Sequence, residues 1–289
     1  MLPEVILRPY FRFAEIVGRG GEGWVLVMSY NIRHGLGCDG VLDLERIAAV
    51  IESVSPDVVG LNEVDVRFHR RSGWADQLGW LSRRLKMASC FGPTLRRRHG
   101  GLPSGGYGNG LLTRDPILRH HHLTFSMKVG EPRGILVADL EREGRTVRLV
   151  VTHLGLTPVM RRRQVEALRG LCREWTGPMV VMGDWNVTPE QPEVTRLSPW
   201  LTDALSFCGV TGGTYPCLRP RKRIDYIFCS SHFRILEASV VSVEDCPSDH
   251  LPVKCLLDWS KDEAGSGIMG TNRRAERDGG GRSRSRLSG

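Results

Sequence analysis

Short apolar runs rich in β-forming residues, each bounded by turn residues, limit most strongly what this chain can fold into. Two segments between them have helical periodicity: one is expected to begin after Asp43, a good N-cap, and another to span about Pro158 to Trp175. Several runs follow one another with no helix between, which disfavours a simple parallel doubly wound sheet. The pattern predicts an α/β fold with mixed sheets packed face to face and helices outside. The predicted strands lie at 24–30, 57–61, 134–140, 147–152, 179–183, 224–229 and 235–243.

The two ends of the chain differ in character from the region 25–258, which is predicted to be one catalytic-type domain. Residues 259–289 contain GSG, GGG and RSRSR segments and too few apolar side chains to compensate the entropy of ordering. They are expected to form a disordered basic tail. Residues 1–24 are expected to be an extension that is disordered or not native. Their glycines match a kinase glycine loop in spacing, but no VAIK-type lysine, HRD or DFG follows.

Composition says more about the cellular location of the protein than about its function. The formal net charge of +8 suits an anionic substrate. The eight cysteines form no CxxC pair and most lie in apolar segments, so neither a zinc site nor a disulfide framework is expected. No membrane-spanning run and no secretory signal is recognised, which predicts a cytoplasmic protein without stable membrane insertion and with no obligate protein partner evident.

Polar side chains stand at the ends of several predicted strands, where they can converge on one mouth. Asn31 ends the first run, and its amide can orient a phosphate oxygen or a carboxylate. Glu63 follows the second run and is a hard oxygen ligand suited to Mg²⁺ or Mn²⁺. His153 follows a continuous apolar strand and could donate to a phosphoryl oxygen, although a lone histidine there is more often structural.

Two further strand ends carry groups suited to acid–base chemistry. Asp184 and Asn186 lie two residues apart, so in extended geometry both would point to one face and orient a water. Asp225 and His250 are candidates for a carboxylate-polarised general base, and the adjacent Asp249 is free to bind metal. Each residue alone has an ordinary alternative as a capping Asp, a turn Asn or a satisfied His, but the full ordered set is hard to attribute to chance.

This ordered set resembles the endonuclease/exonuclease/phosphatase family, a DNase I-like superfamily, over about residues 25–257. GDWN together with SDH is the most specific part of the resemblance. It implies a four-layer α/β sandwich and hydrolysis of phosphate esters. The matching motifs are SYNI with Asn31, LNEVD with Glu63, YGNGLLTR with Asn109, THL with His153, GDWN with Asp184 and Asn186, IDYIF with Asp225, and SDHLPV with Asp249 and His250.

The resemblance also implies roles for these residues. A catalytic Mg²⁺ (or Mn²⁺) would be held by Glu63 with help from Asn31 and Asp249. A His250–Asp225 pair, with Asp184, would activate or orient the attacking water, while Asn186 and His153 would stabilise the developing oxyanion. Arg133 and Asn109 would bind the substrate phosphate, with an exposed surface arginine as the ordinary alternative for Arg133.

The substrate is not indicated by these motifs. Arg33 stands where abasic-site endonucleases of the family carry an acidic residue, which weakens that subgroup. Arg96, Arg97, Arg98 and His99 are expected to form a basic loop that could grip a phosphate backbone or a polyphosphate head group, with a solvated charge run as an equal alternative. The histidines 120–122 are expected in a loop. The leading hypothesis is a metal-dependent phosphodiesterase, nuclease-like in substrate. The alternatives are an enzyme for a small-molecule or lipid phosphoester, and a non-catalytic binding protein.

Overall fold

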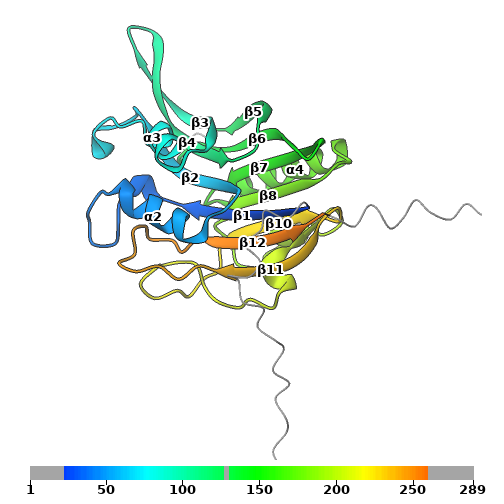
Figure 1. The fold of residues 1–289 in the computed structure, drawn as a ribbon. Helices are drawn as coiled ribbons and strands as arrows, with labels where there is room; N and C mark the ends of the chain where they lie inside the picture. The colour runs from blue at the N-terminus through cyan, green and yellow to red at the C-terminus, as the bar shows by residue number, and fades with distance from the viewer. Residues whose placement is uncertain (1–22, 127–129, 260–289) are drawn as a thin grey trace, which may run out of the picture.

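Two six-stranded mixed sheets form the centre of the protein, and helices cover their outer faces (Figure 1). The computed structural model describes residues 23–126 and 130–259. The first sheet contains, in spatial order, β11 (Arg234–Val240), β12 (Val253–Asp258), β1 (Trp24–Asn31), β2 (Val58–Val66), β4 (Leu102–Thr113) and β3 (Ala88–His99). The second contains β5 (Ile117–Phe125), β6 (Arg133–Arg142), β7 (Arg145–His153), β8 (Met179–Asp184), β10 (Asp225–Ser230) and β9 (Leu201–Asp203). The predicted four-layer sandwich is confirmed.

Strand alternation explains why the central strands are apolar on both faces. Val25 and Val27 of β1 pack in the layer between the two sheets. Leu26 and Met28 of the same strand point the other way, into the layer beneath the first pair of helices. Because both faces of the strand are buried, its sequence is a continuous apolar run rather than an alternating one.

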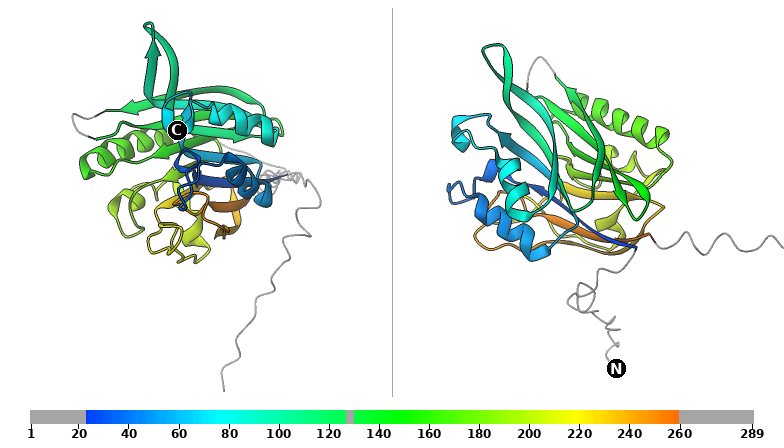
Figure 2. Two further views of the ribbon diagram at one scale, coloured as in Figure 1. Left: turned by 90° about the vertical axis from the view of Figure 1, so that its left-hand side faces the viewer. Right: turned by 45° about the horizontal axis from the view of Figure 1, so that its top comes forward.

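The two predicted helices are confirmed. Helix α2 (Leu44–Val54) begins at Asp43, whose side chain accepts from the Glu45 amide, and α4 (Pro158–Glu174) begins at Thr157. Helices α2 and α3 (Gln77–Leu85) cover the first sheet, and α4 covers the second (Figure 2). The short helical segments are η1 (Arg33–Gly35), η2 (Arg70–Ser72), α5 (Pro192–Thr195) and α6 (Ala204–Phe207). No helix among the described residues is long and apolar enough to cross a membrane.

Five strands were absent from the prediction, and two expected loops are strands. Arg96–Arg98 lies on β3, which pairs with β4 in a hairpin that turns at Gly100 and Gly101, both with positive φ. The histidines 120–122 lie on the edge strand β5. Both segments are polar because they project from the body or line a sheet edge, so burial imposes no apolar pattern on them.

The expectation that no disulfide would be present is wrong, because Cys217 and Cys246 are bonded with their Cα atoms 5.9 Å apart. The two cysteines are 29 residues apart in the chain, and only the fold brings their loops together. The buried free cysteines, such as Cys90 and Cys255, do pack as small hydrophobes.

The folded residues that the structure describes reach slightly past the expected domain limits. Trp24, placed in the predicted extension, begins β1 and pairs with Asp258. Trp259, placed in the predicted tail, is buried in the core and donates its amide to the Gly23 carbonyl. The predictions for 1–22 and 260–289 concern residues outside the described part.

Candidate active site

Strand register brings the predicted polar residues to one end of the sandwich. In the first sheet β1 and β2 are parallel, and Asn31 lies beside Asn62. In the second sheet β7 and β8 are parallel and β10 is antiparallel, so Asp184 lies between His153 and Asp225. The carboxyl ends of four parallel-paired strands therefore meet at a common edge, where their terminal side chains face one another.

A buried amide network joins the two sheets directly beneath this edge. Asn62 donates from Nδ2 to Asn109 Oδ1 at 2.9 Å and to the Thr152 carbonyl at 3.0 Å, and its Oδ1 accepts from the Asp184 amide at 2.8 Å. Asn109 Nδ2 donates to the carbonyls of Gly134 and Val151. Both ends of the Asn109 amide are thus bonded to protein groups, and its contact with substrate phosphate stays a prediction.

Close approach of the strands at this point requires glycine. Gly183 has φ of +140°, and a Cβ atom there would lie 1.8 Å from the Thr152 carbonyl oxygen. A side chain at residue 183 would therefore force β8 away from β7 at the position just before Asp184. This is the physical reason for the glycine of the GDWN motif.

His250 and Asp225 form the predicted pair, with Asp184 beside them. His250 Nδ1 lies 2.9 Å from Asp225 Oδ2, and His250 Nε2 lies 3.6 Å from Asp184 Oδ2. Burial alone would lower the pKa of His250, but the charges of Asp225 and Asp184 outweigh it and raise the pKa to about 10. Burial also raises the pKa of Asp184, to about 7, despite the opposing charge of His250. The two carboxylates therefore favour the protonated, positively charged form of the His250 ring.

His153 lies on the other side of Asp184. Its Nε2 is 3.3 Å from Asp184 Oδ2, but the orientation does not make a hydrogen bond, and the atom has no other partner within the described residues. Burial, with the charges of Arg133 and His250, lowers the pKa of His153 well below its ordinary value. The ring is neutral at physiological pH, so it can offer an N–H without carrying charge.

Asn186 departs from the geometry expected of it. The prediction that Asp184 and Asn186 share a face of an extended strand is wrong, because β8 ends at Asp184 and Asn186 has φ of 53°. The Asn186 amide instead turns back to donate to Asp184 Oδ1 at 2.9 Å, and its side chain donates to the Leu154 carbonyl. Asn186 therefore stays next to Asp184 through a hydrogen-bonded turn and not through an extended strand.

The predicted metal ligands lie beside this group. Glu63, with φ of 60°, sits at an irregularity of β2, and Asn31 Nδ2 lies 3.3 Å from Glu63 Oε1 and 3.1 Å from Asp184 Oδ2. Asn31 Oδ1 accepts from the Arg33 amide, so the nitrogen of this side chain faces the carboxylates. Burial raises the pKa of Glu63, and the nearby charge of Asp249 adds to the increase.

Arg133 is a buried arginine, which excludes the alternative of an exposed surface residue. It is 8% exposed and forms an ion pair with Glu131. Its positive charge acts to lower the pKa of Glu63 and of His153, although burial makes the net shift of Glu63 upward. A cation in this position is available to an anionic group entering the site.

Several positioning residues were missed by sequence reasoning. Ser248 donates to the Asn31 carbonyl at 2.7 Å, and Thr214 Oγ1 accepts from the Asp225 amide. The ring of Tyr215 lies 4.9 Å from that of His250. Ser248 belongs to the motif SDH and could have been found there, as Asn62 of LNEVD was: the sequence offers Asn62 as a candidate beside Glu63. Thr214 and Tyr215 carry no local signal.

Comparison with known proteins identifies the family of this chain. Residues 28–250 match the Endonuclease/Exonuclease/phosphatase family, and the chain belongs to it. Members hydrolyse phosphate esters and depend on a divalent metal, so this chain is a hydrolase of that class.

Solved structures agree with the assignment. An endonuclease/exonuclease/phosphatase from Beutenbergia cavernae DSM 12333 is 28% identical with a TM-score of 0.71, over 82% of this chain and 72% of that one. A mannosyl-6-phosphatase from Bacteroides thetaiotaomicron VPI-5482 is 20% identical with a TM-score of 0.65, over 81% and 99%. The human Nocturnin catalytic domain with bound sulfate is 22% identical with a TM-score of 0.61, over 82% and 94%. The last two likenesses show the fold.

The donor set fits a divalent cation. Glu63 and Asp184 are carboxylates whose pKa values are raised by burial, so their charges lack full compensation from the protein. In the described part of the chain, ligand atoms of Asp184, Asp225 and His250 also lie within 4.8 Å of one another. His250 Nδ1 and Asp225 are already bonded to each other, which leaves the oxygen-rich Glu63 side as the better match to Mg²⁺ or Mn²⁺.

Proposed function

We propose that this protein is a phosphodiesterase that uses Mg²⁺ or Mn²⁺ and acts on nucleic acid. The observation that carries the catalytic part is the row of His153, Asp184 and His250 with Asp225 behind His250. A binding protein that had lost catalysis would gain nothing from burying these groups together, because each costs free energy to desolvate.

Asp184 and His250 act on the attacking water. The side chains lie 3.6 Å apart, so the Asp184 carboxylate can accept a proton from a water between them while the charged His250 ring donates one to the leaving oxygen. Asp225 fixes the ring and stabilises its charged form through Nδ1. Neutral His153, with Asn186, donates to the phosphoryl oxygens as negative charge develops.

Glu63 would hold the metal, with Asn31 and Asp249 as its helpers. The bound cation supplies positive charge at the phosphate and lowers the cost of developing negative charge there. Arg133 binds and orients the phosphate from the side of β6, where its charge acts on Glu63 and its side chain contacts Tyr107. Asn109, bonded to Asn62, supports this arrangement from below.

The β3–β4 hairpin supports a polymeric anion as substrate. It projects from the body of the protein (Figure 2). The last residues of β2, Asp65 and Val66, pair with Tyr107 and Gly106 of β4, so the hairpin leaves the sheet where β2 ends. Arg96 and Arg98 are exposed on this arm.

Basic groups continue from the arm to the site. Arg97 stacks over the ring of the half-exposed Trp74 at 4.1 Å, and Arg71 lies over Tyr107 at 5.0 Å. Arg133 lies near Tyr107 as well. The exposed guanidinium groups of the arm and the half-exposed Trp74 ring fit the phosphates and a base of a nucleic acid strand, whereas the buried Tyr107 ring supports Arg71.

The test is a substrate panel with Mg²⁺ or Mn²⁺: plasmid DNA, abasic duplex, single-stranded DNA and RNA, lipid phosphodiesters, inositol phosphates and bis(p-nitrophenyl) phosphate. The wild type is compared with the triple variant Arg96→Gln, Arg97→Gln and Arg98→Gln, and bis(p-nitrophenyl) phosphate, which is too small to reach the arm, is the control substrate. We expect the kcat/KM of the triple variant to fall about tenfold or more on nucleic acid, with a weaker salt dependence, and to stay unchanged on bis(p-nitrophenyl) phosphate. Turnover of only a small or lipid phosphoester, indifferent to the arm, would favour the alternative substrate class.

The cytoplasmic location predicted from the sequence stays a prediction. The Cys217–Cys246 bond weighs against a reducing compartment, where such bonds are uncommon.

A further inference from the structure

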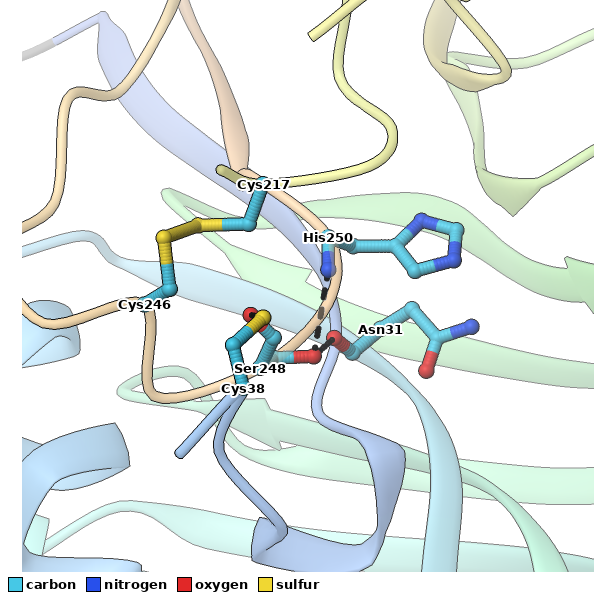
Figure 3. The surroundings of a disulfide bond; sticks show 6 residues. All are labelled: Asn31, Cys38, Cys217, Cys246, Ser248 and His250. Carbon is cyan, nitrogen blue, oxygen red and sulfur yellow. Dashed lines mark hydrogen bonds between the residues drawn. A yellow bond between two sulfur atoms is a disulfide. The ribbon is translucent and has the colours of Figure 1, made fainter. Parts of the chain in front are cut away.

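The Cys217–Cys246 disulfide joins two loops that both reach the His250–Asp225 pair. One loop leads from Thr214 to Cys217, and the other leads from Cys246 past Ser248 to His250. Figure 3 shows the bond between the two cysteines and the position of His250 beyond Ser248. Neither loop is part of a strand or helix, so the sheets do not fix their mutual position. What holds them together is a small number of contacts that surround the disulfide.

The loop that carries Cys217 contacts both members of the pair. Thr214 Oγ1 accepts from the Asp225 amide at 3.3 Å, and the ring of Tyr215 packs against that of His250 at 4.9 Å. Two backbone hydrogen bonds of 2.7 Å, from Cys217 to the Asp249 carbonyl and from Leu251 to the Thr214 carbonyl, enclose His250. A shift of this loop therefore moves the imidazole or its carboxylate partner.

The loop that carries Cys246 has a backbone that needs outside support. Asp245 and Cys246 have φ of 54° and 38°, in the left-handed region that costs free energy for residues with a Cβ atom. The Cys246 carbonyl accepts from the Cys38 amide, and the Ser248 carbonyl lies 3.5 Å from Cys38 Sγ. The disulfide is the one covalent constraint at this strained point, four residues before His250.

We propose that the Cys217–Cys246 bond is a positioning element for the His250–Asp225 pair, so that reducing it lowers the rate of the chemical step. The inference rests on the function proposed above. The reductant is a dithiol: its two S–H groups give two electrons and two protons, the protein S–S bond becomes two S–H groups, and the dithiol becomes a cyclic disulfide. Glu63 and Arg133 lie on β2 and β6, which the disulfide does not touch, so binding of phosphate should persist. Asp249 lies on the loop that carries Cys246, so the two redox forms are compared at saturating Mg²⁺.

The experiment compares the oxidised protein with protein reduced by dithiothreitol, using bis(p-nitrophenyl) phosphate and Mg²⁺. We expect kcat to fall about tenfold or more, KM to change less than about twofold, and reoxidation to restore kcat. The double variant Cys217→Ser, Cys246→Ser should match the reduced protein and not respond to dithiothreitol. The Cys208→Ser variant, which removes an exposed free cysteine, should behave as the wild type.

Other readouts separate positioning from loss of folding and from failure of the proposed function. Circular dichroism at the assay temperature must show the reduced protein folded. The ring ¹H–¹⁵N signals of His250, assigned with His250→Gln, should shift on reduction even if no substrate is hydrolysed. An unchanged kcat together with unshifted His250 signals would overturn the proposal, as would non-reducing peptide mapping that lacks a Cys217–Cys246 link. Absence of hydrolysis by the oxidised protein, with shifted signals, would count against the proposed function alone.

Discussion

Two aspartates of the same sheet, each 2% exposed, have opposite pKa shifts. Asp139, in the middle of β6, accepts from Arg148 at 2.7 and 2.9 Å and from Arg119 at 2.7 Å. Although burial opposes it, these guanidinium groups hold the pKa of Asp139 below its ordinary value. Asp184, at the end of β8, instead receives neutral donors from Asn31 and Asn186, and burial raises its pKa.

The difference shows how one sheet separates stability from catalysis. At Asp139 the protein supplies the compensating charge itself, from strands on either side. At Asp184 the protein leaves the compensation incomplete, and neighbouring polar atoms such as His153 Nε2 and Asp225 Oδ1 have no hydrogen-bond partner among residues 23–126 and 130–259. Unsatisfied buried groups cost stability, and they are retained where a metal, water or substrate completes them.

Removing divalent metal should give the largest effect. We expect EDTA to abolish hydrolysis and added Mg²⁺ or Mn²⁺ to restore it, because the charge of Glu63 is then neutralised again. The measurement is initial rate against free metal concentration. Glu63→Gln should need far more metal for half-maximal rate, whereas Asp139→Asn should follow the wild-type curve. Full activity in EDTA would remove the basis for a metal at this edge.

Loss of the Asp184 charge should come next. Asp184→Asn preserves the volume but removes the carboxylate beside His250, so kcat should fall about 10²-fold or more while the thermal unfolding temperature changes little. His250→Ala should have a comparable effect. Steady-state kinetics with circular dichroism as a control checks this. Wild-type turnover in both variants would show that the catalytic roles are assigned to the wrong groups.

The same substitution at Asp139 should have the converse result. Asp139→Asn leaves Arg148, which is 9% exposed, without its charged partner. Unfolding in urea should show a loss of about 3 kcal/mol, the scale for breaking a buried ion pair. The kcat of the folded protein should remain that of the wild type. Similar stability losses for the two Asp→Asn variants would mean that the contrast between the sites is not real.

The sequence alone predicts Asp184 but not Asp139, and the reason is how far apart in the chain the contacting residues lie. Asp184 could be predicted as a site residue because it ends an apolar strand inside the GDWN motif, and α2 could be predicted from its own spacing and cap. Asp139 was not noticed, because its partners Arg119 and Arg148 become neighbours only through the β5–β6–β7 register. The Cys217–Cys246 bond and the Tyr215–His250 contact escaped for the same reason, since loops that meet in space share no sequence pattern.

The pH dependence of stability should give the smallest and most specific difference between the two aspartates. The pKa of Asp139 is lower in the folded protein than in the unfolded chain, where it is about 3.9. Its contribution is therefore fully present above the unfolded value and is lost as the pH falls through the folded one. The urea stability of the wild type should exceed that of Asp139→Asn at pH 6 and approach it below about pH 4, because protonated Asp139 resembles Asn. A difference that stayed constant from pH 6 to pH 3 would mean that the charge of Asp139 is not what Arg119 and Arg148 stabilise.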